Sequence, residues 1–234
     1  MNKTIKKIPY VTVMIAALNE EKNITKVIKE CLKLKQYKLE ILVVIDSKTT
    51  DNTKAVAEKA GAKVIHTGKW QGKGYALRQG QKYVKGDYVV QLDADYQFMP
   101  YDIPKLIKPL ENGYDVALGS RHERNSKVEE GSVTAFRDFG NYLLSAAASI
   151  AARQRVSDVL AGFKAFKTKV LKDINFTEVH YGYEAEEVIL AAKKGYKIIN
   201  IPIDYKKRVE GGSNVMPIKH GLMFLNTIVR TALK

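Results

Sequence analysis

The sequence is poor in cysteine, and its few histidines are scattered. Of its 234 residues, Cys31 is the one cysteine, so no disulfide can form within the chain. This composition is typical of proteins in a reducing compartment. The histidines are His66, His122, His180 and His220, and their spacing matches no zinc-ligand pattern. These absences exclude a disulfide framework and give no indication of a zinc site.

The chain also lacks long apolar runs. Its longest stretch without a charged residue or a histidine, residues 139–152, has 14 residues, whereas a helix that spans a bilayer needs about 20. The basic segment at residues 1–9 is not followed by the apolar core of a signal peptide. The sequence therefore predicts a cytoplasmic protein.

Acidic residues are few relative to basic ones. The chain has 39 Lys and Arg against 25 Asp and Glu, a formal net charge of +14. Such a molecule attracts polyanions, which include nucleic acids, anionic membrane surfaces and phosphorylated substrates. Its basic residues are spread along the chain and no nucleic-acid-binding motif is present, so we expect no nucleic-acid partner. The remaining composition is that of one globular domain.

Apolar runs with β-branched residues alternate with stretches of helical period. The predicted strands cover residues 11–16, 41–45, 63–66, 88–92 and 116–118. Helical stretches separate the first four and precede the fifth, which predicts an α/β fold with a mostly parallel sheet and helices on both faces. One more strand is expected over residues 197–205. A linker at residues 209–217 then leads to a helix begun by Pro217.

Polar residues follow three of these five strands. Asn19 and Glu20 follow the first, Asp46 the second, and Asp93 and Asp95 the fourth. Because ligands of parallel sheets bind beyond the carboxyl ends of the strands, we expect a site at this edge. In "VVQLDADYQ" the two aspartates stand one residue apart, and their like charges repel unless a cation or shared protons lie between them. The alternative is a polar loop in which they cap the strand end.

Seven short motifs occur along the chain. They are "AALNEE" (16–21), "DSKTTDNT" (46–53), "GKGYALRQG" (72–80), "DADYQ" (93–97), "GSR" (119–121), "AGFKAF" (161–166) and "RVEGGSN" (208–214). In content and order they resemble the family 2 glycosyltransferases, most of all the dolichol-phosphate and polyprenol-phosphate mannose and glucose synthases. The resemblance covers about residues 11–214. It implies a GT-A-type fold of the nucleotide-diphospho-sugar transferases, with the transferase domain over residues 1–216.

The resemblance also assigns a metal and a nucleotide site. Asp93, Asp95 and Gln97 would bind Mg²⁺ or Mn²⁺, hard cations that stabilise a nucleoside diphosphate as it leaves. The residues expected around the nucleotide are Ala16, Leu18, Asn19, Glu20, Asp46, Lys73, Asp93 and Ala94. For Asp46 the less favoured alternative is an Asx-turn or a helix cap. For Lys73 the alternative is an ordinary helix start, because glycine-rich helix starts are common.

The chain departs from the family pattern at three positions. Ala16 stands where the family has proline, Ser47 replaces the second aspartate of "DDGS", and Asn214 replaces a final lysine. Lys206 or Lys207 are candidates for the missing charge. These changes leave the donor open between GDP-mannose, slightly favoured by the resemblance, and a UDP-sugar such as UDP-glucose.

Three arginines are candidates for an anionic acceptor. Arg121, Arg137 and Arg208 could bind its phosphate, because a guanidinium offers paired donors that match phosphate oxygens. For Arg137 an ordinary surface position is equally favoured. The resemblance further implies catalytic roles for Asp95, Arg121 and Arg208. The expected reaction is an inverting, metal-dependent hexosyl transfer to a polyprenyl or dolichyl phosphate.

No obvious general base is present, which favours a phosphate acceptor. A lipid monophosphate is largely ionised at pH 7, whereas a hydroxyl must lose a proton as it attacks. A hydroxyl acceptor, soluble or on a polysaccharide, is the first alternative and would require one acid among Asp158, Glu184, Glu186 and Glu187. A non-catalytic nucleotide-binding module is the second.

The segment "PIKHGLMFLNTIVRTALK" (217–234) predicts an amphipathic helix. At 100° per residue, one half of the wheel carries Ile218, Leu222, Phe224, Leu225, Ile228, Val229, Ala232 and Leu233, and the other carries Lys219, His220, Asn226, Thr227, Arg230 and Lys234. This pattern favours a helix lying in an anionic membrane surface on the cytoplasmic side. The alternatives are packing on the domain or a partner subunit, or a link to a membrane-anchoring partner protein. A second apolar helix, at residues 136–152, fits a core position or a lipid-facing wall equally well.

Overall fold

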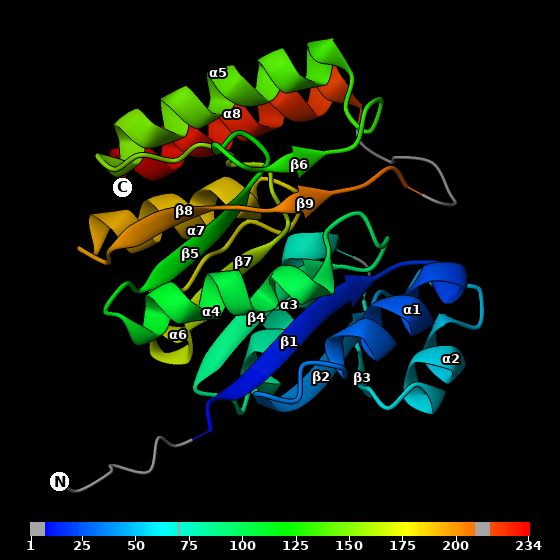
Figure 1. Ribbon diagram of the computed structural model, residues 1–234. Coiled ribbons are helices and arrows are strands. Elements are labelled where there is room, and N and C mark those ends of the chain that lie inside the picture. Colours follow the sequence, from blue (N-terminus) through cyan, green and yellow to red (C-terminus); the bar gives the residue numbers. More distant parts are fainter. Residues whose placement is uncertain (1–7, 70, 209–215) are drawn as a thin grey trace, which may run out of the picture.

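The computed structural model describes residues 8–69, 71–208 and 216–234 (Figure 1). Its strands are β1 (Tyr10–Ala17), β2 (Lys38–Ile45), β3 (Lys63–His66), β4 (Tyr88–Asp93), β5 (Val116–Ser120), β6 (Lys127–Val128), β7 (Lys164–Lys167), β8 (Ile198–Pro202) and β9 (Asp204–Tyr205). Its α-helices are α1 (Glu21–Cys31), α2 (Thr53–Lys59), α3 (Lys73–Gly80), α4 (Ile103–Glu111), α5 (Ala135–Ala152), α6 (Thr168–Ile174), α7 (Tyr183–Lys193) and α8 (Pro217–Leu233). The expected alternation of strands and helices is present.

Seven strands form the central sheet, in the order β3-β2-β1-β4-β7-β5-β8. The five strands predicted from the sequence, β1 to β5, all run parallel, and β1 pairs with β2 over its whole length, from Tyr10 opposite Lys38 to Ala17 opposite Ile45. Successive side chains of a strand point to opposite faces. Val13 and Ile15 thus pack with α1, α2 and α4, while Met14 packs with α3, α6 and α7. The mostly parallel sheet with helices on both faces is confirmed.

Two strands differ from the expectation. Strand β7 was not predicted, and it runs antiparallel between β4 and β5, with Lys164 opposite both Gln91 and Leu118. Its four residues include two lysines, so it carries no apolar run. The strand expected over residues 197–205 is divided: β8 pairs with β5, and β9 pairs with β6. Pro202, which ends β8, has no backbone N–H with which to continue a ladder.

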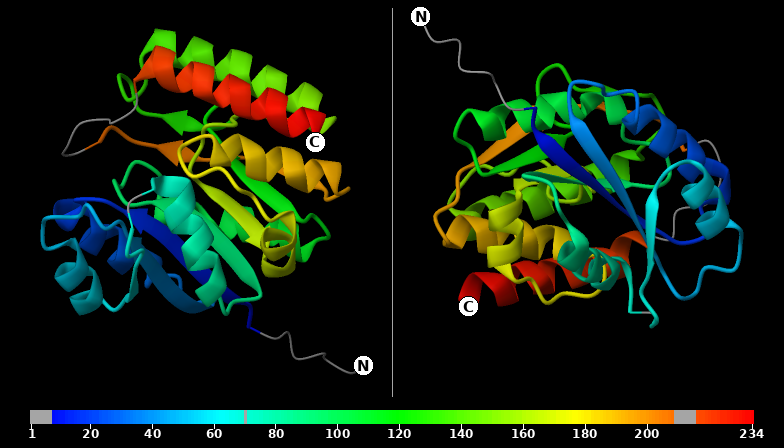
Figure 2. Two further views of the ribbon diagram at one scale, coloured as in Figure 1. Left: turned by 180° about the vertical axis from the view of Figure 1, so that it is seen from behind. Right: turned by 90° about the horizontal axis from the view of Figure 1, so that it is seen from below.

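Helices α5 and α8 lie side by side at one end of the molecule, and α8 also contacts α7 (Figures 1 and 2). Thr134 caps α5 by accepting a hydrogen bond from the backbone N–H of Arg137. Phe224 and Ile228 of α8 are buried in the core that also contains α7. Among the described residues, no helix is long and apolar enough to cross a membrane.

Both halves of the predicted wheel contribute to the buried side of α8: Phe224 and Ile228 come from the apolar half and Thr227 from the polar half, whereas Lys219 and Asn226 of the polar half are exposed. Thr227 and Thr231 are buried, and each satisfies its hydroxyl on a carbonyl oxygen one turn earlier in the helix. Arg230 binds Glu178 at 2.9 Å, and the Lys234 ammonium lies 3.1 Å from Glu186. The wheel did not indicate this orientation because it contains no information on the acids that α8 meets. Of the predicted linker, residues 209–215 lie outside the described part of the chain.

Candidate functional site

A cleft of about 1330 Å³ lies at the carboxyl ends of β1, β2 and β4. The predicted site residues that line it are Ala16, Leu18, Glu20, Asp46, Lys73, Asp93, Ala94, Asp95, Gln97, Arg121, Arg137 and Arg208. Asn19 does not line it. Segments distant in the sequence therefore meet at one cavity, as the position of polar residues at the strand ends had predicted. Their individual roles stay predictions.

Two aspartates and two basic side chains form the floor of the cleft. Asp93 ends β4, and the Lys73 ammonium lies 2.6 Å from its Oδ1 atom. Asp95 is only 7% exposed; its Oδ2 accepts a hydrogen bond from Arg208, and its Oδ1 accepts the backbone N–H of Gln97 at 3.1 Å. Burial and then the charge of Asp93 raise the pKa of Asp95, although Arg208 opposes them. The floor therefore favours additional positive charge.

The donor set at this floor fits a hard divalent cation. Asp93 and Asp95 offer carboxylate oxygens, and Gln97 lines the same cleft. The Gln97 Nε2 atom donates to the carbonyl of Lys206 at 3.1 Å, so a metal would use the amide oxygen. Within the described part of the chain, no three His, Cys, Asp or Glu side chains are grouped as a metal site. A cation bound here would complete its shell with oxygens from substrate or water.

The motif "AGFKAF" supplies the backbone against which Asp93 packs. A Cβ atom at Gly162 would overlap both carboxylate oxygens of Asp93. Any other residue would displace the carboxylate, so glycine allows the close approach of the loop before β7. This contact gives a physical reason for a glycine at this point of the motif.

The loops after β1 and β2 bind each other. Asn19 has a φ of 54°, and its Oδ1 atom accepts the backbone N–H of Thr50 at 2.8 Å. The backbone N–H of Glu20 donates to Thr53 Oγ1 at 2.8 Å, and Asp51 accepts the first N–H of α1 at 3.1 Å. Asn19 thus shapes the loop from outside the cleft.

Glu20 and Asp46 point into the cleft from these two loops. Burial raises the pKa of Glu20, the Asn23 side chain lowers it, and the charge of Asp95 raises it further. Asp46 is buried, and its Oδ1 atom accepts the backbone N–H of Lys48 at 2.9 Å. This is the Asx-turn that the sequence allowed, and it orients a carboxylate that also lines the cleft.

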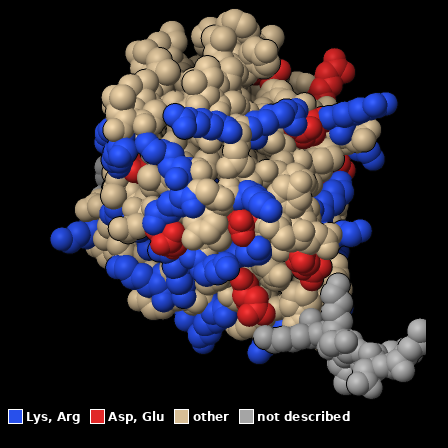
Figure 3. Space-filling model, turned by 90° about the vertical axis from the view of Figure 1, so that its left-hand side faces the viewer, with Lys and Arg blue, Asp and Glu red and all other residues tan. Residues whose placement is uncertain are grey.

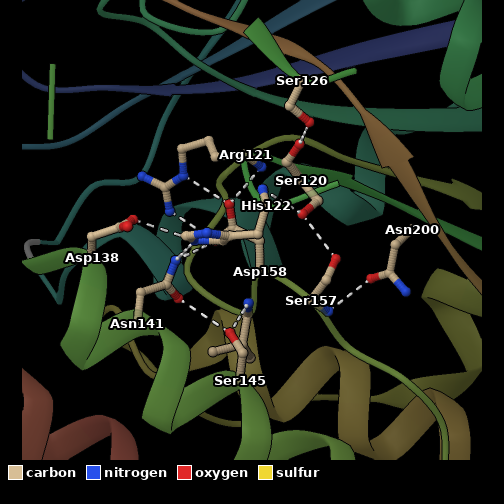
Figure 4. Close-up of polar contacts among 11 residues, drawn as sticks. Ser120, Arg121, His122, Ser126, Asp138, Asn141, Ser145, Ser157, Asp158 and Asn200 are labelled. Carbon is tan, nitrogen blue, oxygen red and sulfur yellow. Dashed lines mark hydrogen bonds and ion pairs between the residues drawn. The ribbon is translucent and has the colours of Figure 1, made fainter. Parts of the chain in front are cut away.

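Arg121 belongs to a buried polar network around Asp158 (Figure 4). Its Nε and Nη2 atoms lie 2.7 and 2.8 Å from the two carboxylate oxygens of Asp158, which is 0% exposed. Asn141 of α5 donates to the same carboxylate at 2.7 Å. Burial alone would raise the pKa of Asp158, but Arg121 and the hydrogen bonds lower it. Two of the donors of Arg121 are therefore used inside the protein, and the network ties α5 to the loop after β5.

The four candidate general bases lie in different surroundings. Glu184 lines the cleft, where the Lys73 ammonium lies 3.2 Å from it, and the other three do not line it. Asp158 is paired with Arg121, and Glu186 accepts backbone N–H groups at residues 177 and 178. Glu187 is fully buried and accepts a hydrogen bond from Gln91 at 2.7 Å.

The opposite wall of the cleft was not predicted from the sequence. This wall is formed by the N-terminal halves of α5 and α8 and includes Phe136, Arg137, Phe139, Pro217, Lys219 and Phe224. Of these, Arg137 alone had been assigned to the site. The feature of the sequence that could have indicated this wall is the absence of charged residues over residues 139–152. That feature suited a buried core helix as well as a helix lining the cleft.

Comparison with known proteins agrees with the motifs. Residues 12–174, well over half of the chain, match the family model "Glycosyl transferase family 2". The glycosyltransferase AglJ of Haloferax volcanii is 32% identical over 193 residues, covering 82% of this chain and 62% of its own. A dolichol-phosphate mannosyltransferase of Pyrococcus furiosus is 29% identical, covering 88% of this chain and 59% of its own. The chain thus spans about three-fifths of the length of these two relatives.

A solved structure shows the same fold. Glucosyl-3-phosphoglycerate synthase of Mycobacterium tuberculosis, crystallised with Mn²⁺, uridine diphosphate and phosphoglyceric acid, superposes with a TM-score of 0.73 at 23% identity over 96% of this chain and 78% of that one. The expected GT-A fold is confirmed. With an α/β sheet that gathers the motif residues in one cleft and a family match over residues 12–174, the chain belongs to glycosyl transferase family 2.

Proposed function

We propose that this enzyme transfers a hexose from a nucleotide sugar to a polyprenyl or dolichyl phosphate, with inversion at the anomeric carbon and with Mg²⁺ or Mn²⁺ as cofactor. The observation that carries this proposal is the make-up of the cleft. Acids and basic residues at its floor suit a diphosphate with its cation, while the facing wall of α5 and α8 is largely apolar. The name of the Pyrococcus relative supports the same acceptor class.

The donor half of the cleft suits a nucleoside diphosphate. Glu20 and Asp46 would face the nucleoside, and Lys73 the diphosphate. Asp93, Asp95 and Gln97 would hold the cation, which as a Lewis acid stabilises negative charge on the departing diphosphate. Mn²⁺ and uridine diphosphate in the mycobacterial synthase support this assignment. We keep GDP-mannose as the favoured donor and UDP-glucose as the alternative.

The acceptor half contains the arginines. Arg137 and Arg208 would contact the acceptor phosphate. Arg121 would donate to the same phosphate through guanidinium N–H groups that do not bind Asp158. An oxygen of the acceptor phosphate attacks the anomeric carbon as the bond from that carbon to the donor's phosphate oxygen breaks. The nucleoside diphosphate leaves with the electron pair. Because the acceptor is ionised at pH 7, no side chain has to remove a proton.

An apolar surface supports contact with a membrane. The exposed large side chains of this surface are Phe136, Phe139, Tyr142, Leu143 and Ile150 on α5, and Ile218, Leu222, Leu225, Val229 and Leu233 on α8. Figure 3 shows this end of the molecule as largely uncharged, with Lys and Arg spread over the surface below it. Apolar patches of this kind mark contact surfaces. We propose that α5 and α8 together rest on the cytoplasmic face of a membrane.

A transfer assay tests the proposal. Wild-type protein is incubated with GDP-mannose or UDP-glucose, Mg²⁺ or Mn²⁺, and either a polyprenyl phosphate or a panel of hydroxyl acceptors. We expect a lipid-linked sugar to form only when metal is present. The Glu184→Gln variant should still form it, with turnover reduced at most severalfold. Transfer to hydroxyl acceptors alone, abolished by Glu184→Gln, would support the first alternative. Nucleotide binding without any turnover would support the non-catalytic module.

A further inference from the structure

A second cavity, of about 310 Å³, lies between α5 and α8. Its lining is entirely apolar or glycine: Gly140, Leu143 and Leu144 from α5, and Pro217, Ile218, Gly221, Leu222 and Leu225 from α8. We call it the α5–α8 groove. Five of these residues, Gly140, Leu143, Leu144, Pro217 and Gly221, also line the large cleft. The groove is therefore a continuation of the cleft along the two helices.

Two glycines keep the groove open. A Cβ atom at Gly140 or at Gly221 would meet no other atom within 4 Å, so each faces open space. Leu143 and Leu222 border the groove and are 52% and 66% exposed, while Leu144 is buried at 9%. A flexible apolar chain could enter here from the cleft without displacing any side chain of the core.

The end of the groove that meets the cleft is positively charged. Arg137 lies one turn before Gly140 on α5, and Lys219 lies two residues before Gly221 on α8; both line the cleft. A molecule with an anionic head and an apolar tail matches this sequence of surfaces, since the head meets basic groups and the tail leaves water.

We infer that the α5–α8 groove binds the first isoprene units of the acceptor as they leave the cleft. This inference rests on the proposed polyprenyl phosphate acceptor and makes that proposal more specific. It separates two uses of the same helices: their outer side chains rest on the membrane, and the groove between them guides one lipid chain to the reaction centre. The acceptor should then be selected by its chain even where no membrane is present.

A series of soluble acceptors tests this inference. Dimethylallyl, geranyl and farnesyl phosphates carry one, two and three isoprene units and are used in detergent-free buffer, so membrane recruitment plays no part. For wild-type protein we expect kcat/KM to rise at each step, because each unit buries further apolar surface. In Gly140→Leu and Gly221→Leu, leucine fills the groove. We expect kcat/KM for farnesyl phosphate to fall at least about tenfold, towards that for dimethylallyl phosphate.

Matched controls place the same new side chain outside the groove. Ala146 on α5 and Asn226 on α8 are exposed and line neither cavity. Ala146→Leu and Asn226→Leu should keep the wild-type dependence on chain length. If a glycine variant fails to fold, Leu143→Ser with Leu222→Ser removes the rim of the groove through exposed residues and should weaken the same dependence.

The outcomes separate this inference from the proposed function. Transfer to all three prenyl phosphates at equal efficiency, or an unchanged dependence in the folded glycine variants, would overturn the groove while keeping the acceptor class. An equal loss in the control variants would overturn it as well. No transfer to any prenyl phosphate, combined with transfer to a hydroxyl acceptor, would overturn the proposed function itself.

Discussion

The carboxylate of Asp95 carries the charge on which the proposed reaction depends most. Burial and Asp93 raise its pKa, although Arg208 opposes them, so the charge of Asp95 does not contribute to the stability of the free protein. We expect Asp95→Asn to reduce transfer by at least about 100-fold while the melting temperature stays near that of wild type. Asp173→Asn, at an exposed position of α6 away from the cleft, is the control. Near-normal turnover of Asp95→Asn would refute the metal assignment.

Glu187 makes stability depend on pH in an unusual direction. Burial raises its pKa from 4.5 to about 7, although Lys164 opposes the shift. Between these values the folded state binds the extra proton, so the contribution of Glu187 to the free energy of unfolding falls as pH rises from 4.5 through 7. This contribution changes by on the order of 3 kcal/mol in total.

Glu187→Gln should remove this pH dependence. Urea unfolding of wild type and variant at several pH values between 4 and 8 measures the difference in slope. The contribution of Glu186 changes with pH in the opposite direction. Burial raises the pKa of Glu186, but backbone hydrogen bonds and Lys234 lower it by more, so its pKa lies below the ordinary value. Its contribution is therefore lost as pH falls through the lowered value. Parallel curves for wild type and Glu187→Gln would show that Glu187 does not titrate in this range.

Helix α8 has an inner and an outer apolar side. Phe224 and Ile228 are 4% and 2% exposed and pack in the core, so Phe224→Ala should lower the free energy of unfolding by about 3 to 5 kcal/mol. The outer residues Ile218, Leu222 and Val229 are 71%, 66% and 50% exposed. Changing these three to serine should leave the melting temperature unchanged and abolish flotation with anionic liposomes.

Because α8 has both a buried and an exposed apolar side, its membrane role is tested better by substitution than by deletion. Deleting residues 217–234 would remove core contacts and two ion pairs, so loss of flotation in that truncation would not separate binding from unfolding. The triple serine variant isolates the surface. If it floats as well as wild type, α8 is not the contact with the lipid, and the partner-protein alternative is favoured.

Ligand binding should stabilise the entire fold, because the cleft joins loops from distant parts of the chain. A ligand that binds only the native state adds RT ln(1 + [L]/Kd), about 2.7 kcal/mol at 100 times Kd. We expect a thermal shift with GDP and Mg²⁺ or Mn²⁺ that exceeds the shift with UDP, and EDTA should remove most of it. A shift with neither nucleotide would contradict the assignment of Glu20, Asp46 and Asp93 to the donor site.

Much of the architecture follows from the sequence by itself. The five β-branched runs became β1 to β5, and the polar residues after three of them met at one edge, because parallel strands end on the same side of their sheet. Asp46 also formed the Asx-turn that its position allowed. These features depend on local pattern and on chain direction, and both are present in the order of the residues.

The long-range pairings depend on how distant segments pack against each other. Arg121 meets Asp158 across 37 residues, β7 enters between β4 and β5, and Arg230 of α8 pairs with Glu178. A helical wheel shows which residues share a side but not which side is buried, and a lone charged residue does not indicate its partner. Burial and charge neutralisation select among these arrangements once distant segments are in contact, so the sequence determined the edge at which the site lies, and the packing of α5 and α8 determined its other wall.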